Sequence, residues 1–128
     1  MTQKKSQKKV VLLVEDDIFI REIYDRKITA EGYEVELAKD GVEAINFLKK
    51  QIPDLILLDI VMPRMDGREV LAKLKSHKEW KNIPVIMLTN LSEKEEIEEE
   101  LGQGVDEYII KAHFTPSEVM AKIKKFLI

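Results

Sequence analysis

The chain has 128 residues, enough for one domain with its own core, and its formal net charge of −3 gives no reason to expect nucleic-acid or membrane partners. It contains no cysteine, which excludes disulfides, thiolate metal sites and cysteine nucleophiles. Its apolar runs are too short to span a bilayer and none has signal-peptide length, so we expect a cytoplasmic protein. Residues 1–8 are expected to form a flexible basic tail and residues 9–128 a single domain.

Strand-like apolar runs alternate with helical patterns along the whole chain. Five pairs of a strand and a following helix are predicted in order: 10–14 and about 17–30, 33–38 and 40–51, 55–58 and 67–75, 85–89 and 92–101, and 106–110 with a last helix that opens at Thr115. The alternating pattern of 33–38 predicts an edge or less buried strand.

Capping residues support several of these helix starts. Asp40 is the expected N-cap of the second helix, and Ser92 with Glu95 forms a capping box before the fourth. Thr115, followed directly by proline, caps the fifth. In the first helix, four apolar residues are expected on the packed side: Ile20, Ile23, Tyr24 and Ile28.

Five β/α units in one chain imply a parallel sheet with helices on both faces. Because crossovers between parallel strands are right-handed, the expected fold is a doubly wound α/β sandwich. In such sheets the ligand site lies beyond the carboxyl ends of the strands. The polar residues at those ends are therefore the candidates for function.

Polar side chains follow four of the five predicted strands: Glu15, Asp16 and Asp17 after the first, Asp59 after the third, Thr89 at the end of the fourth and Lys111 after the fifth. Without a partner these carboxylates would repel one another, and the pKa of some would rise. Magnesium, a hard cation that prefers oxygen ligands, would relieve the repulsion. Zinc is a poor candidate because the chain lacks cysteine and because His77 and His113 lie outside this cluster.

Asp59 follows the unbroken apolar run 55–58, so a buried strand brings a carboxylate to the edge of the sheet. A carboxylate can act as a nucleophile and accept a phosphoryl group as an acyl phosphate. The transferred group spreads negative charge over three oxygens, so its transfer needs cations and hydrogen-bond donors. Magnesium, the Lys111 ammonium and the Thr89 hydroxyl could each serve one oxygen.

Each of these residues alone also has an ordinary structural interpretation. A strand-end aspartate is common as a turn former or helix cap, and for Asp17 we prefer the cap. Thr89 alone fits strand composition, and Lys111 alone fits a surface charge. Their convergence on one edge of the sheet favours chemistry.

Four motifs make the chain similar to the receiver domain of two-component response regulators: VLLVEDD, LILLDIVMPRMDG, VIMLTN and DEYIIKA. The resemblance covers the chain from about Lys8, and the intervals between the strand-end residues fit it as well. It implies the flavodoxin-like receiver fold, with five strands in the order 2-1-3-4-5 and five helices.

By this resemblance Asp59 is the phosphoacceptor, and its donor is a histidine kinase, a phosphotransfer protein or a small phosphodonor. The resemblance also implies a magnesium ion bound by Asp16 and Asp59, with Glu15 assisting and the backbone carbonyl of Val61 as a further ligand. Lys111 takes its place beside the phosphoryl group.

The resemblance further implies a two-state switch. Thr89 binds the phosphoryl group and moves toward it, and Tyr108 matches the rotating aromatic residue. A downstream protein partner would then bind the face made by the fourth helix, the fifth strand and the fifth helix. Since no output domain follows Ile128, we expect output through a partner or a relay, unless the chain is a piece of a longer regulator.

Three departures from the family pattern carry expectations. The usual Lys-Pro after the fifth strand is here Lys111-Ala112, so a trans peptide bond and an altered loop are expected. Asn90 replaces a residue that is usually small, and could narrow the access of phosphate or donate a hydrogen bond. Val61 and Leu91 are both apolar, so we expect them to hinder the attacking water and to prolong the phosphorylated state.

Three other functions remain open at this point. A receiver-fold binding module regulated without phosphorylation would explain Ala112 and Asn90. An aspartyl phosphohydrolase would need a second acid where Val61 stands, and a flavin-binding relative would need a polar phosphate loop in place of the acidic EDDIF. The acidic predicted helix 92–101 fits either a solvated face or a docking surface for a basic partner.

Overall fold

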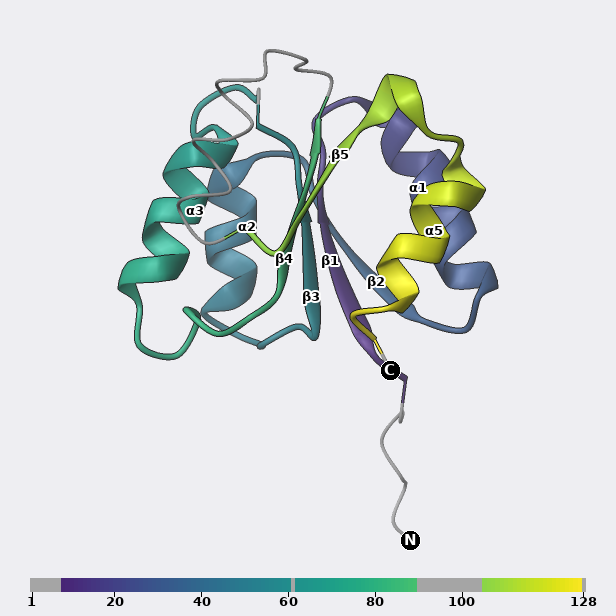
Figure 1. Ribbon diagram of the computed structural model, residues 1–128. Helices are drawn as coiled ribbons and strands as arrows, with labels where there is room; N and C mark the ends of the chain where they lie inside the picture. The colour runs from purple at the N-terminus through teal and green to yellow at the C-terminus, as the bar shows by residue number, and fades with distance from the viewer. Residues whose placement is uncertain (1–7, 61, 90–104, 128) are drawn as a thin grey trace, which may run out of the picture.

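One parallel sheet lies between two layers of helices. The strands in the described part of the chain are β1 (Val10–Val14), β2 (Glu34–Ala38), β3 (Leu55–Leu58), β4 (Val85–Thr89) and β5 (Glu107–Ile110). The helices there are α1 (Ile18–Ala30), α2 (Gly41–Leu48), α3 (Gly67–Ser76), the 3₁₀ turn η1 (Lys111–His113) and α5 (Pro116–Lys124). The strand order is β2-β1-β3-β4-β5 with every pair parallel. Helices α2 and α3 cover one face, and α1 and α5 cover the other (Figure 1). The predicted fold class and strand order are confirmed.

This computed structural model describes residues 8–60, 62–89 and 105–127, without the side chains of Thr89 and Ala112. The predicted helix 92–101 and three residues singled out from the sequence, Val61, Asn90 and Leu91, lie outside the described residues. Within that part of the chain, no helix is long and apolar enough to cross a bilayer.

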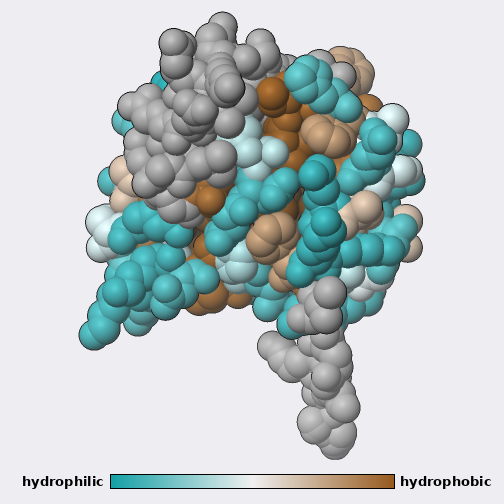
Figure 2. Space-filling view, viewed as in Figure 1, coloured by the Kyte–Doolittle hydropathy of each residue, from teal (hydrophilic) through white to brown (hydrophobic). Residues whose placement is uncertain are grey.

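The central strands are apolar throughout because both of their faces are covered. Alternate residues enter separate cores: Leu12 and Leu58 pack with α2 and α3, whereas Leu13 and Leu57 pack with α1 and α5. Strand β2 pairs only with β1 and is largely half-buried, which confirms the edge position expected from its alternation. On the face shown in Figure 2, hydrophilic side chains dominate the outer surfaces of the helical layers.

The caps expected for the described helices are present, whereas the Ser92–Glu95 capping box lies outside the described residues, and one packing detail is corrected. Asp17 caps α1, since its side chain accepts from the N–H groups of Phe19 and Ile20, and Thr115 forms a full capping box with Glu118. Ile23, expected on the packed side of α1, is instead 49% exposed. The inner stripe of α1 is formed by three residues spaced four apart, namely Ile20, Tyr24 and Ile28, and Ile23 lies at its edge.

Candidate functional site

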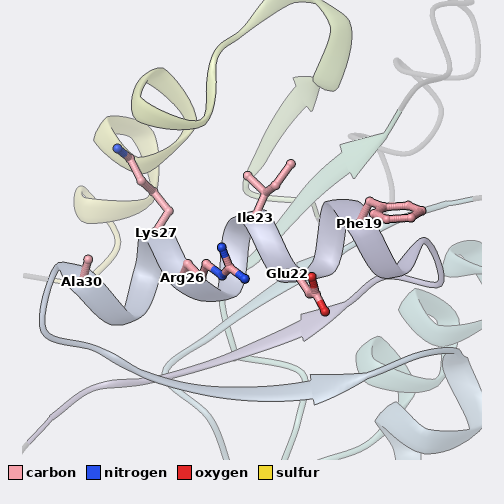
Figure 3. A pocket seen from close by; sticks show the side chains of 6 residues that line it. All are labelled: Phe19, Glu22, Ile23, Arg26, Lys27 and Ala30. Atoms are coloured by element: carbon pink, nitrogen blue, oxygen red, sulfur yellow. The ribbon is translucent and has the colours of Figure 1, made fainter.

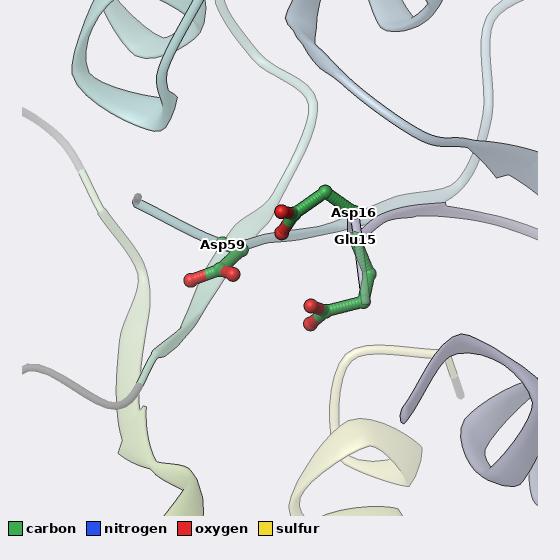
Figure 4. Close-up of side chains that lie close together, drawn as sticks. All are labelled: Glu15, Asp16 and Asp59. Carbon is green, nitrogen blue, oxygen red and sulfur yellow. The ribbon is translucent and has the colours of Figure 1, made fainter. Parts of the chain in front are cut away.

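Three carboxylates meet where β1 and β3 end. Glu15 and Asp16 follow β1, and Asp59 follows β3, so parallel pairing of the two strands brings them to one edge. Each contributes one oxygen to a group whose members all lie within 4.8 Å of one another. Figure 4 shows the three side chains turned toward a common space. Such a set of hard oxygen ligands could hold a divalent cation.

Lys111, at the start of η1, bridges two of these acids. Its Nζ lies 2.5 Å from Glu15 Oε1 and 3.5 Å from Asp59 Oδ2, and its side chain is only 8% exposed. The Lys111–Ala112 peptide bond is trans, as expected, and the chain continues in the 3₁₀ turn. The substitution of alanine for proline therefore leaves the ammonium group in the cluster.

Burial dominates the electrostatics of the two inner acids. Loss of solvent raises the pKa of Asp59 above its ordinary value, although the Lys111 ammonium and the N–H of Ile60 oppose the shift. Loss of solvent likewise raises the pKa of Glu15, again against the attraction of Lys111. A further cation bound between these buried carboxylates would stabilise their charged forms.

Short backbone contacts position the phosphoacceptor candidate. The N–H of Ile60 donates to Asp59 Oδ1 at 2.8 Å, and the N–H of Asp59 donates to the Val14 carbonyl at 3.1 Å. Gly67 is required at the start of α3, since a Cβ there would stand 2.2 Å from the Asp59 carbonyl oxygen. On the β1 side, Arg21 Nη1 donates to the Glu15 carbonyl at 2.8 Å.

The other candidates from the sequence lie apart from this cluster or outside the described structure. Asp17 turns to its capping role. The Thr89 backbone ends β4 at the same edge of the sheet, but its side chain is outside the described part of the structure, as is Val61. Tyr108, on β5, is half-buried and packs against the core on the α2–α3 side.

Sequence reasoning missed an ion pair beside the cluster. Asp40, the α2 cap, accepts from the Arg64 guanidinium through Oδ2. Burial acts to raise the pKa of Asp40, but the N–H of Glu43 and the Arg64 guanidinium outweigh it and hold the pKa below its usual range. The cap motif pointed to Asp40, but nothing in the spacing pointed to a partner 24 residues away.

A second surface feature lies along α1, away from the acids. A hollow of about 390 Å³ is lined by Phe19, Glu22, Ile23, Arg26, Lys27 and Ala30 (Figure 3). Phe19 is 75% exposed and the neighbouring Ile18 is 52% exposed. With Ile23, these side chains gather exposed apolar surface on one helix, and a contiguous apolar patch, unlike a single exposed residue, can mark a contact with another molecule.

Comparison with known proteins assigns the family. A family model described as the response regulator receiver domain matches residues 11–124. The chain belongs to the response regulator receiver family. Among curated proteins it is similar to the probable transcriptional regulator ycf27 of Porphyridium aerugineum, with 37% identity over 121 residues, which cover 94% of this chain and 49% of that protein. The receiver therefore spans about half the length of the curated relatives that it matches.

Solved receiver structures are similar over nearly the whole chain. The chemotaxis protein CheY4 of Vibrio cholerae is 32% identical with a TM-score of 0.86, over 94% of this chain and 99% of that one. The Mn²⁺-bound response regulator Rcp1 is 31% identical with a TM-score of 0.78, over 88% of each chain. This chain is thus a phosphorylatable receiver domain of the two-component class.

Proposed function

We propose that this receiver accepts its phosphoryl group on Asp59, with Mg²⁺ as the cofactor. The observation that carries the proposal is the cluster itself: three carboxylates within 4.8 Å, two of them contacted by a buried lysine. Asp59 is the member that extends directly from the most buried strand, so its position relative to the sheet is rigid. A nucleophile fixed in this way reduces the entropy lost on reaching the reactive geometry.

In the proposed reaction, an Asp59 carboxylate oxygen attacks the phosphorus of the donor. A bond forms between that oxygen and phosphorus while the bond from phosphorus to the donor breaks, and the donor leaves with the electron pair. Lys111 places positive charge beside the oxygens of the transferring group. Thr89, at the end of β4, is proposed to donate its hydroxyl hydrogen bond to the same group.

The residues present fit magnesium by charge and ligand type. Asp16 and Asp59 would bind it directly, Glu15 would assist through water, and the carbonyl of Val61 would complete the protein ligands. When bound, the ion neutralises the charge of the acids and of the phosphoryl group. The raised pKa of Asp59 and Glu15 indicates that two acids lack compensation within the protein alone.

We assign the protein contacts of this receiver to two surfaces. Phosphorylation would shift Thr89 and Tyr108, and so change the face around β5 and α5 that a downstream partner binds. The exposed Ile18 and Phe19 follow Asp16 by two and three residues, so a histidine kinase or phosphotransfer protein that reaches Asp59 is proposed to cover them.

A donor of this kind favours a cytoplasmic location for the receiver. The proposed domain comprises residues 9–128 and follows a flexible tail at 1–8.

The proposal is tested by intact-mass analysis after incubation with acetyl phosphate, with Mg²⁺ or with a chelator. We expect one phosphate adduct on the wild type with Mg²⁺, and none with the chelator or on Asp59→Asn. Asp54→Asn is the matched control, because Asp54 is an exposed aspartate at the opposite end of β3. An equal adduct on Asp59→Asn would refute the assignment.

A further inference from the structure

The loop between β3 and α3 is held to the start of α2 by a buried carboxylate. Asp40 is only 3% exposed, and its two oxygens have different partners. Oδ1 accepts from the Glu43 N–H at 2.9 Å, which caps α2, while Oδ2 accepts from Arg64 Nε at 2.9 Å and also from Arg64 Nη2. One buried side chain therefore joins a helix start to a loop 24 residues away.

Arg64 has an unusual backbone for its residue type. Its φ is 66°, in the left-handed region that side chains other than glycine seldom adopt. Such a conformation persists only where the surrounding structure enforces it. Two interactions hold it here: the Met65 N–H donates to the Pro63 carbonyl at 2.8 Å across Arg64, and the Arg64 guanidinium forms a charge-assisted contact with the buried Asp40 carboxylate.

A second contact joins the same two segments. A Cβ added at Gly41, the first residue of α2, would stand 2.5 Å from the Met65 carbonyl oxygen. The β3–α3 loop thus approaches the α2 backbone more closely than any side chain at this position would allow. At its base the loop is closed by the Gly67 N–H, which donates to the Ile60 carbonyl at 2.7 Å.

The Asp40–Arg64 ion pair also borders the carboxylate cluster. Asp40 and Arg64 line a hollow of about 460 Å³ together with Asp16, Arg21, Lys39 and Pro63. Asp16 thus belongs both to this hollow and to the carboxylate cluster. The Gly67 N–H at the far end of the loop donates to the carbonyl of Ile60, the residue directly after Asp59, so a change in the loop would reach the carboxylate cluster through the backbone.

We infer that Asp40 and Arg64 are positioning residues for the phosphorylation reaction: their ion pair holds the β3–α3 loop in the conformation that binds Mg²⁺. This inference rests on the proposed function. It differs from a simple capping role, because the cap uses Oδ1 whereas the loop uses Oδ2. Removing the Arg64 side chain should therefore weaken the metal site without weakening α2.

Two variants separate the two roles of Asp40. Arg64→Gly removes the ion pair. Because glycine also adopts the left-handed backbone at this position without strain, the variant should stay close to the wild type in stability. Asp40→Asn keeps a capping oxygen but loses the charge that attracts Arg64. Lys124→Ala is the control, because it removes another ion pair, Lys124 with Glu31, between α5 and the end of α1.

The experiment combines two measurements on each protein. Amide hydrogen exchange of the metal-free protein should be faster in residues 62–67 of Arg64→Gly and Asp40→Asn, and unchanged in Lys124→Ala. Calorimetric titration with MgCl2 should give a Kd about 10-fold higher for the first two variants, as expected for a group that orients a metal ligand. Denaturation midpoints close to the wild type would exclude general unfolding as the cause.

The outcomes distinguish this inference from the function on which it rests. If the wild type binds Mg²⁺ and both variants bind it within two-fold of the wild type, the inference is wrong and the proposed function stands. If the wild type itself binds no Mg²⁺, both are wrong. Weaker binding by Lys124→Ala as well would also overturn the inference, because the effect would then not be specific to this loop.

Discussion

Replacing Asp59 by asparagine is expected to stabilise the metal-free protein at neutral pH, although it removes the proposed phosphoacceptor. Asparagine has nearly the same shape, and its Oδ1 can still accept from the Ile60 N–H. Lys111 keeps its 2.5 Å contact with Glu15. The substitution therefore removes one buried negative charge and little else.

The charges around Asp59 nearly cancel. With an effective dielectric constant of about 20, attraction to Lys111 at 3.5 Å is about 4.7 kcal/mol, and repulsion from Glu15 within 4.8 Å is at least about 3.5 kcal/mol. Asp16, which lies within the same 4.8 Å, also repels Asp59, although its side chain is exposed and solvent screens the repulsion. The cost of burying the carboxylate, several kcal/mol, then decides the sign. We expect a net stabilisation of about 1–3 kcal/mol.

The effect should depend on pH in a defined direction. Because the folded-state pKa of Asp59 is raised, the folded protein binds this proton more tightly than the unfolded chain does. The buried charge of Asp59 destabilises the folded protein fully at pH values above its folded-state pKa. This destabilisation disappears as the pH falls toward the pKa of Asp59 in the unfolded chain. The advantage of asparagine should therefore shrink as the pH falls from neutral toward the ordinary pKa of aspartate.

Urea denaturation with a chelator, followed by circular dichroism, measures this difference. Asp54→Asn, at an exposed aspartate that accepts from the Val10 N–H, should remain within about 0.5 kcal/mol of the wild type. Mg²⁺ at 100 times its Kd should stabilise the wild type by about 2.7 kcal/mol and the asparagine variant much less, so the advantage of asparagine should largely disappear or reverse. An asparagine variant less stable than the wild type in chelator at neutral pH would refute the reasoning.

Three further predictions concern Lys111, Gly67 and Phe19. Lys111→Met should lower the free energy of unfolding by about 3–5 kcal/mol at neutral pH and by less at about pH 5, because two buried acids lose their cation; an equal loss at both pH values would contradict this. Gly67→Ala should cost about 2–4 kcal/mol in the same denaturation assay, since its Cβ meets the Asp59 carbonyl, and a neutral effect would show that the loop can shift freely. Phe19→Ala should slow phosphotransfer about 10-fold when the donor is a histidine kinase fragment that phosphorylates the wild type, and should leave the rate with acetyl phosphate unchanged. Equal slowing with both donors would show that Phe19 acts in the chemical step instead.

The sheet could be predicted from the sequence because its signals are local. Unbroken apolar runs such as Leu55–Leu58 predict strands covered on both faces, and alternation in β2 predicts its place at the edge. Parallel pairing places Glu15 and Asp59 at the same edge of the sheet, and the strand order implied by the resemblance makes their strands neighbours, as the structure shows. Lys111 directly follows β5, so it joins the two acids because β5 ends at the same edge of the sheet.

Other features depend on side-chain directions and backbone angles that no local pattern contains. The exposure of Ile23 follows from which stripe of α1 meets the sheet, and four apolar residues on one helix permit two choices. The Arg64 contact depends on a left-handed backbone angle in a residue type that seldom adopts one. The sequence pattern indicated that Asp40 caps a helix, but nothing in it indicated the contact between Asp40 Oδ2 and Arg64.

The identity of the phosphorylated residue is tested most directly by borohydride trapping. Borohydride reduces an aspartyl phosphate to homoserine, so the phosphorylated position is marked permanently and can be found by peptide mass spectrometry. After treatment with acetyl phosphate and Mg²⁺, the account predicts homoserine at position 59 and at no other aspartate of the cluster. Reduction at Asp16 in its place, or a phosphate adduct with Asp59 unreduced, would contradict the account.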